Sequence, residues 1–316
     1  MTLENTKISV VIPVSERVSN VAELYQAYKQ ALESMQNPFD ITYILDGDYP
    51  EELQVLTGLQ AKGENIKIIK LAKWFGEAIA LNAGFDNTDG EVILTLPSYY
   101  QVEPVDIPKL ISELQDCHMT VAVRWPRIDA SANKMQSRAF HWIVNKITDS
   151  QYRDLGCGAR AFHRQVIEEV PIYGDQHRFL PLLAEQRGFN VKQVELQQSK
   201  LDEHRRIYKP GIYLRRIIDI LTVFFLVKFT KKPLRFFGLV GSATFLLGGI
   251  LLAGLVLERL IGGVALADRP ALLLSSLLVV LGVQLFALGL IGELIIFTHA
   301  KDIKEYTIEE IVNRES

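Results

Sequence analysis

Short apolar runs alternate with longer amphipathic stretches over the first part of the chain. The first run, Ile8 to Val14, carries no charged residue, which is typical of a parallel strand covered on both faces. The same pattern predicts strands at 8–14, 41–45, 66–71, 91–96 and 120–123, and helices at about 18–35, 51–61, 76–85 and 132–147. A further strand should follow the glycine-bearing loop from Asp154 to Arg160. We therefore expect an α/β fold with a mostly parallel sheet, whose ligands bind beyond the carboxyl ends of the strands.

Two much longer apolar runs follow in the last third of the chain. Phe236 to Leu257 is an uncharged run of 22 residues, and Ala271 to Phe297 is a run of 27 broken only by Gln284 and Glu293. A helix needs about 20 apolar residues to cross the hydrocarbon core of a bilayer, so both runs qualify as membrane spans. Two buried helices of a soluble protein are the alternative. Lysine and arginine cluster before the first run and after the second, which predicts that both termini are cytoplasmic.

An amphipathic stretch precedes the first apolar run. Tyr213 to Phe229 mixes cations with bulky apolar residues, as a helix lying in the membrane interface does, and a weaker pattern of this kind precedes Arg187. We thus expect a cytoplasmic domain at 1–210, an interfacial helix and basic linker at 211–235, a transmembrane hairpin at 236–300 with spans at 236–257 and 271–297, and a cytoplasmic tail at 301–316. The protein should be a multi-pass protein of the inner (plasma) membrane.

Charge and cysteine content narrow the possible partners. The net charge of −3 argues against a nucleic-acid binder. The two cysteines, Cys117 and Cys157, have no metal-ligand spacing and indicate a reducing compartment.

Several motifs follow one another in a recognisable order. They are Val11-Ile-Pro-Val14 with Glu16, Asp46-Gly47, Phe75-Gly76 with Ala80 to Gly84, Asp154-Leu-Gly-Cys-Gly-Ala-Arg160, His177-Arg-Phe-Leu-Pro181, and Gly289-Leu-Ile-Gly-Glu293. The order resembles the family 2 inverting glycosyltransferases that charge polyprenyl phosphates, such as dolichyl-phosphate mannose synthases and bacterial undecaprenyl-phosphate glycosyltransferases. The first motif resembles the family's Val-Ile-Pro-x-x-Asn-Glu, and the fifth resembles its Arg-x-x-x-Pro acceptor helix. The resemblance covers nearly the whole chain and implies a GT-A-like fold, a nucleotide-sugar donor, a polyprenyl-phosphate acceptor and a homo-oligomer.

The chain departs from this family at the expected metal site. Pro97 and Tyr99 stand where the family has the metal-binding Asp-x-Asp, and Leu45 replaces an aspartate that helps to read the nucleotide base. Mg²⁺ or Mn²⁺ therefore lacks its usual ligands here, although Asp48, or Glu103 with Asp106, offers replacement carboxylates. Arginines are the other means of neutralising a diphosphate, through bidentate contacts.

Candidate site residues fall into three groups. The catalytic candidates are Arg124, Asp154 and Arg160. The donor-binding candidates are Pro13, Glu16, Asp46, Asp48, Tyr99 and Gln101. The acceptor-phosphate candidates are Arg127, Arg205, Arg206 and Tyr208. Structural alternatives stay open: Arg124 can simply pair with Asp154, Asp46 can form a turn with Gly47, and the basic stretch near Arg206 can attract anionic head groups.

Two classes of function follow from these expectations. The first is an enzyme, a hexosyltransferase that moves a sugar with inversion from a nucleotide-sugar to undecaprenyl phosphate at the cytoplasmic membrane face, for synthesis or modification of a cell-envelope polysaccharide. The alternative is a non-catalytic relative that binds lipid phosphate or scaffolds such a pathway, or whose nucleotide pocket senses a small molecule.

Overall fold

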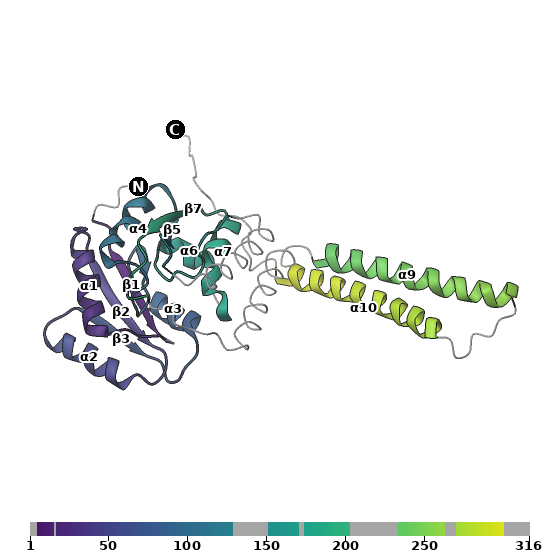
Figure 1. The fold of residues 1–316 in the computed structure, drawn as a ribbon, viewed down its shortest axis with the longest axis horizontal. Coiled ribbons are helices and arrows are strands. Elements are labelled where there is room, and N and C mark those ends of the chain that lie inside the picture. Colours follow the sequence, from purple (N-terminus) through teal and green to yellow (C-terminus); the bar gives the residue numbers. More distant parts are fainter. Residues whose placement is uncertain are drawn as a thin grey trace. The chain divides into compact units, whose positions relative to one another are not determined.

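The computed structural model describes residues 5–15, 17–128, 151–170, 174–202, 233–262 and 270–299. The chain divides into two compact units, Met1–Asp219 with Glu305–Ser316 and Ile220–Lys304. The predicted helix at 132–147, the interfacial helix at 213–229 and the tail at 301–316 lie outside the described residues. Figure 1 shows the elements of both units.

The first unit is built on one mixed sheet. Its strands, in the described part of the chain, are β1 (Ile8–Val14), β2 (Phe39–Leu45), β3 (Ile66–Lys70), β4 (Val92–Thr95), β5 (Met119–Arg124), β6 (Arg160–His163) and β7 (Val191–Leu196). They lie in the order β3-β2-β1-β4-β6-β5-β7. All neighbours pair in parallel except β6, which runs antiparallel to both β4 and β5. The expected mostly parallel α/β fold is confirmed.

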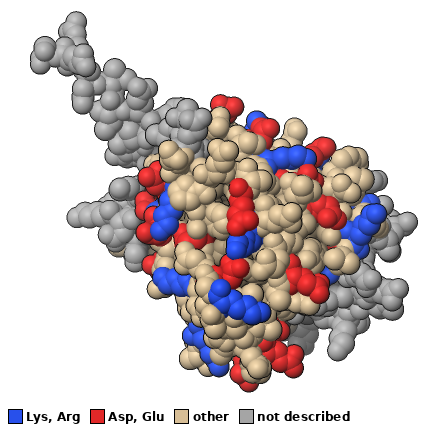
Figure 2. All heavy atoms as spheres, turned by 90° about the vertical axis from the view of Figure 1, so that its left-hand side faces the viewer, with Lys and Arg blue, Asp and Glu red and all other residues tan. Residues whose placement is uncertain are grey.

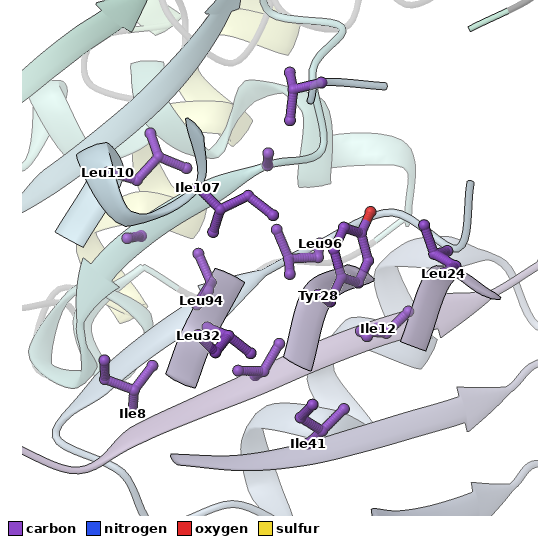
Figure 3. Close-up of a cluster of buried hydrophobic side chains, with 14 of the residues drawn as sticks. Ile8, Ile12, Leu24, Tyr28, Leu32, Ile41, Leu94, Leu96, Ile107 and Leu110 are labelled. Atoms are coloured by element: carbon purple, nitrogen blue, oxygen red, sulfur yellow. The ribbon is translucent and has the colours of Figure 1, made fainter. Parts of the chain in front are cut away.

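Helices cover both faces of this sheet. The described elements outside the sheet are α1 (Val21–Glu33), α2 (Pro50–Ala61), α3 (Glu77–Asp86), η1 (Pro104–Asp106), α4 (Pro108–Ser112), η2 (Glu113–Asp116), α6 (Arg164–Glu169), η3 (Gly174–Phe179) and α7 (Leu180–Gln186). One core cluster joins α1, α2 and α4 to the sheet, and a second joins α3, α6 and α7 to its other face. In Figure 3, Leu24, Tyr28 and Leu32 of α1 lie over Ile8 and Ile12 of β1. Successive β1 side chains point to opposite faces, so Val11 belongs to the other cluster.

The sequence pattern predicted a second interfacial helix before Arg187, and the structure corrects this prediction. Leu180, Leu182 and Ala184 of α7 are fully buried, and α7 packs beneath the sheet as part of the protein core. Most of its apolar side chains therefore contact the protein core, and Leu183 is partly buried against the same cluster. On the face shown in Figure 2, basic and acidic side chains are interspersed.

The second unit contains the helices α9 (Pro233–Gly262) and α10 (Pro270–His299), which include both predicted spans. By length and composition, both can cross a membrane. They lie side by side (Figure 1), and glycines let their backbones approach closely. A Cβ atom on Gly241, Gly248 or Gly282 would lie 2.5–2.7 Å from a backbone nitrogen of the facing helix. Most large apolar side chains of the hairpin point outward, which suits a lipid environment.

The carboxylate of Glu293 lies within the second span. Its Oε2 accepts a hydrogen bond from the backbone nitrogen of Leu234, at 3.4 Å, in the first turn of α9. The first-turn N–H groups of a helix have no partner within the helix and carry partial positive charge. This contact partly offsets the cost of a carboxylate in an apolar segment.

Candidate active site

Asp46 lies at the carboxyl end of β2 and is fully buried. Its two oxygens accept hydrogen bonds from the backbone nitrogens of Phe75, at 2.7 Å, and Gly76, at 2.9 Å. Gly47 follows with φ +120°, a conformation that side chains disfavour, so the chain can turn sharply there. Asp46 therefore ties the end of β2 to the residues that precede α3, a structural contact that differs from the local turn with Gly47 considered above. Asp48, by contrast, is 88 % exposed and lies 3.8 Å from Lys70.

The tripeptide Pro97-Ser98-Tyr99 follows β4 and is held by the segment that follows β1. The Ser98 hydroxyl donates to the carbonyl of Arg17, at 2.8 Å, and the backbone nitrogen of Ser19 donates to the carbonyl of Ser98, at 2.9 Å. On the other side, the hydroxyl of Tyr28 donates to the carbonyl of Pro97. The tripeptide is therefore fixed at the sheet edge where parallel α/β sheets bind ligands.

Gln101 connects this tripeptide to the Asp154–Arg160 loop. Its Nε2 donates to the hydroxyl of Tyr99, and its Oε1 accepts from the backbone nitrogen of Gly158 at 2.8 Å. Burial is the main reason that the pKa of Tyr99 rises to about 12, so its hydroxyl stays neutral. The two loops thus form one wall of the site.

A buried ion-pair network lies beside that wall. Arg124, at the end of β5, donates from Nε and Nη2 to the two oxygens of Asp154, at 2.7 and 2.9 Å, and from Nη1 to Asp202 at 3.2 Å. Burial alone would lower the pKa of Arg124, but the charge and hydrogen bonds of Asp154 hold it well above its ordinary value. Arg127 approaches the same carboxylate at 3.9 Å. A Cβ on Gly156 would lie 3.3 Å from the Arg124 guanidinium, so glycine leaves room for the pair.

These contacts bear on the expected catalytic roles of Asp154 and Arg124. Asp154 also accepts from the backbone nitrogens of Arg124 and Gly156, so both of its oxygens are engaged. Arg124 is 4 % exposed. The geometry matches the alternative in which the two residues pair with each other, and it favours positioning roles for both.

Arg160 opens β6 and is also buried. Its guanidinium donates to the backbone carbonyls of Cys157, His177, Leu155 and Arg178. Burial lowers its pKa, yet an arginine in a protein stays protonated. Because its donors are taken up by carbonyl groups, Arg160 joins the Asp154–Arg160 loop to η3, which also favours a positioning role.

Arg17 and Asp202 belong to this network, and sequence reasoning missed both. Arg17 Nη1 donates to Asp202 at 3.0 Å, and the Arg17 guanidinium carbon lies 4.1 Å from the centre of the Tyr99 ring. Asp202 is buried and accepts from Arg124 and Gln198 as well. The opening motif held a signal for Arg17, because Arg17 stands where Val-Ile-Pro-x-x-Asn-Glu ends in glutamate. No local motif marks Asp202.

A small cavity adjoins these elements. Among its lining residues are Pro13, Thr95, Pro97, Arg160 and His177. His177 Nε2 lies 3.3 Å from a carboxylate oxygen of Glu77, and its buried Nδ1 has no hydrogen-bond partner among the residues that the structure describes. Burial raises the pKa of Glu77, but the hydrogen bond and charge of His177, with the charges of Arg178 and Arg160, lower it overall.

The residues at the expected metal site do not fit a divalent cation. Neither Pro97 nor Tyr99 offers a carboxylate, and the Ser98 hydroxyl is already donating to Arg17. Within the described ranges, no three His, Cys, Asp or Glu side chains come together as metal ligands. The replacement candidates are engaged elsewhere: Asp106 accepts from Lys109 and the backbone of Gln197, and Glu103 accepts from the backbone of Lys200.

The structure brings Tyr99, Gln101, Arg124, Asp154 and Arg160 into one connected set of contacts. Pro13 lines the adjoining cavity, and Asp46 lies at the neighbouring strand end. Glu16, Arg205, Arg206 and Tyr208 lie outside the described residues.

A mixed sheet with helices on both faces and a site at the strand ends is the architecture of GT-A glycosyltransferases. Residues 9–170 match the sequence model of glycosyl transferase family 2, just over half of the chain. The chain belongs to that family and is a glycosyltransferase.

Curated relatives match the chain over almost its whole length. A dodecaprenyl-phosphate galacturonate synthase from Rhizobium johnstonii is 26 % identical, over 99 % of this chain and 95 % of the relative. An undecaprenyl-phosphate 4-deoxy-4-formamido-L-arabinose transferase from an Enterobacter species is 28 % identical, over 98 % of this chain and 95 % of the relative.

Solved structures share the fold. Glucosyl-3-phosphoglycerate synthase from Mycobacterium tuberculosis, in complex with Mn²⁺, UDP-glucose and phosphoglyceric acid, gives a TM-score of 0.54 at 12 % identity, over 71 % of this chain and 80 % of that chain. A mannosyltransferase from Pyrobaculum calidifontis, in complex with GDP-mannose and Mn²⁺, gives 0.50 at 13 % identity, over 70 % of this chain and 63 % of that chain. At these identities the likeness shows the fold alone.

Proposed function

We propose that this protein transfers a sugar from a nucleotide-sugar to a polyprenyl phosphate at the membrane surface, for a cell-envelope glycan. One observation carries the proposal: a family 2 glycosyltransferase unit and an apolar helical hairpin occur in one chain. Relatives named for dodecaprenyl and undecaprenyl phosphate align with 99 % and 98 % of that chain. The hairpin would hold the enzyme where a lipid acceptor resides.

The proposed reaction is a single displacement. An oxygen of the acceptor phosphate forms a bond to the anomeric carbon of the sugar. The bond from that carbon to the nucleoside diphosphate breaks, and the diphosphate keeps the electron pair. Because the acceptor phosphate is already ionised near neutral pH, no strong general base is required. The site must instead align the two phosphates and neutralise their charge.

This requirement gives the buried network a role. Arg124, Asp154 and Arg160 hold the loops around the site, so we assign them to positioning. Asp46, whose two oxygens accept from the backbone of Phe75 and Gly76, is assigned to positioning for the same reason. Pro13, Tyr99 and Gln101 remain the candidates for contact with the donor, since they come from the ends of β1 and β4. Glu16, outside the described residues, stays a prediction. The exposure of Asp48 and its proximity to Lys70 argue against a role for Asp48 as a replacement metal ligand.

The acceptor-phosphate candidates Arg205, Arg206 and Tyr208 lie shortly before the hairpin in the chain, and the two arginines are cations of the kind that attract the phosphate of a membrane lipid. Arg127 lies instead beside Asp154, at 3.9 Å, and stays a candidate from the resemblance alone. Cations flank the two spans, which supports a multi-pass arrangement with both termini in the cytoplasm. Assembly into a homo-oligomer stays a prediction from the resemblance.

The test is transfer to undecaprenyl phosphate by the full-length protein in detergent. A panel of UDP-, GDP- and dTDP-sugars is supplied, and the lipid product is detected by mass. We expect a glycosylated lipid phosphate from one donor class. If no donor gives product while a related active enzyme does so alongside, the proposal fails and the non-catalytic alternative takes its place.

A further inference from the structure

Arg17 lies beside the tripeptide Pro97-Ser98-Tyr99, which stands where the family has its metal motif. Its guanidinium lies over the ring of Tyr99, 4.1 Å from the ring centre, and Tyr99 occupies the second carboxylate position of the family's metal motif. The Arg17 carbonyl accepts from Ser98, the middle residue of the same tripeptide. A cation supplied by the chain therefore lies next to the position of the missing metal ligand.

The side chain of Arg17 is more exposed than those of Arg124 and Arg160 in the same network. Arg124 and Arg160 are 4 % and 5 % exposed, and their donors are taken by protein groups. The Arg17 side chain is 27 % exposed, and its contact with a carboxylate of the described residues is made by one nitrogen, Nη1, to Asp202. The rest of its donor edge remains available to an incoming anion.

The surroundings fix the orientation of that edge. Asp202 is buried and holds Arg17 from one side, while the aromatic face of Tyr99 supports the plane of the guanidinium. A guanidinium fixed in this way offers parallel N–H groups that match two phosphate oxygens. The exchange of a carboxylate for tyrosine therefore removes a metal ligand and also creates a support for an organic cation.

The charges of this cluster suit an anion. Among the described residues, Arg17, Arg124 and Arg127 face two carboxylates, those of Asp154 and Asp202, so the cluster carries one more positive than negative charge.

We propose that Arg17 binds the donor's diphosphate in place of a divalent metal ion, with Asp202 and Tyr99 positioning it. The inference rests on the proposed function, because the diphosphate belongs to the nucleotide-sugar of that reaction. It assigns the charge neutralisation to one residue and makes diphosphate binding independent of metal.

The experiment uses inorganic pyrophosphate as the probe, so that the nucleotide need not be known. Binding to the full-length protein in detergent is measured by calorimetry, once with EDTA and once with excess Mn²⁺. The wild-type protein should bind equally well in both. Arg17→Ala should weaken binding in EDTA on the order of 10- to 100-fold, the loss expected for charge-assisted hydrogen bonds. Arg17→Lys keeps the charge but loses the paired donors, so its pyrophosphate affinity should lie between those of the wild-type protein and Arg17→Ala.

Arg153→Ala is the matched control. Arg153 is an exposed arginine that pairs with Glu195 and also lies near an aromatic ring, that of Trp125. Its removal should leave pyrophosphate affinity unchanged. If Arg17→Ala fails to fold, as judged by its melting curve, Arg17→Lys becomes the deciding variant because it retains a cation beside Asp202.

Each outcome decides between the inference and the proposed function. Pyrophosphate binding that requires Mn²⁺, that persists unchanged in the Arg17 variants, or that falls equally in Arg153→Ala overturns the inference, even if sugar transfer is observed. Metal-free binding that depends on Arg17 supports it, even if no donor yields product. In that second case the transfer assay alone counts against the proposed function.

Discussion

The substitution Asp154→Asn tests whether the buried network is structural. In the native protein, Asp154 receives two guanidinium hydrogen bonds from Arg124 and further bonds from the backbone nitrogens of Arg124 and Gly156. Asparagine keeps the shape but removes the charge and replaces one acceptor with a donor. Arg124 then keeps a single carboxylate partner, Asp202, in the described part of the chain.

The expected cost follows from the burial of both partners. Breaking a buried ion pair by removing one partner costs about 3–5 kcal/mol, because the remaining charge is left desolvated. For a unit of roughly 200 residues, each kcal/mol lowers the melting temperature by about 2–4 °C. Asp154→Asn should therefore lower it by about 6–20 °C.

The assay is thermal unfolding of the full-length protein in detergent, followed by tryptophan fluorescence. Arg153→Ala is again the control, because it breaks the neighbouring Arg153–Glu195 pair, whose side chains are 53 % and 52 % exposed. An exposed pair contributes about 1 kcal/mol or less. If Asp154→Asn melts within 2 °C of that control, about what 1 kcal/mol produces, then Arg124 does not depend on Asp154 and the positioning role is refuted.

Three further predictions concern packing, thiol chemistry and pH. A Cβ on Gly84 would lie 2.4 Å from Val11 and 2.9 Å from Ile44, so Gly84→Ala should lower the melting temperature. Gly58 has open space around it, so Gly58→Ala should raise the melting temperature slightly. Equal shifts for the two variants would contradict the packing around Gly84. Burial raises the pKa of Cys157 to about 11 from an ordinary 9.0. At pH 8, N-ethylmaleimide should therefore modify Cys157 about 100-fold more slowly in the native protein than in the urea-unfolded protein, which mass spectrometry can follow. Similar rates in the two states would refute this prediction. In the folded protein, His177 lowers the pKa of Glu77 from 4.5 against the effect of burial, so the stability that Glu77 contributes is present above about pH 4.5 and is lost as pH falls through the lowered pKa. The melting temperature of Glu77→Gln should therefore fall less on acidification than that of the wild-type protein. Equal falls would exclude Glu77 as a source of the acid sensitivity.

Local patterns were sufficient to predict most of the elements. The uncharged run at 8–14 became β1 over Ile8–Val14, and the amphipathic stretch at 18–35 became α1 over Val21–Glu33. The strand follows from a short continuous apolar run and the helix from a 3.6-residue periodicity, and the chain itself carries both patterns. The two spans were likewise evident from length and hydropathy alone. The direction of β6 was not evident, because its antiparallel pairing with β4 and β5 joins segments far apart in the chain.

The site divides in the same way. The order of motifs indicated a family 2 glycosyltransferase, and the loss of both Asp-x-Asp carboxylates could be seen in the sequence. The sequence did not reveal whether Arg124 is free or paired, because its partners Asp154 and Asp202 lie 30 and 78 residues away in the chain. Arg17 meets Asp202 across 185 residues.

The sequence by itself determined most strands and helices, the two long apolar helices and the chemical types present at the strand ends, because these depend on neighbouring residues. Only the tertiary structure decided which charges are neutralised inside the protein and which guanidinium remains partly open. Burial and long-range pairing set those properties, and both arise only when the sheet brings its strand ends together.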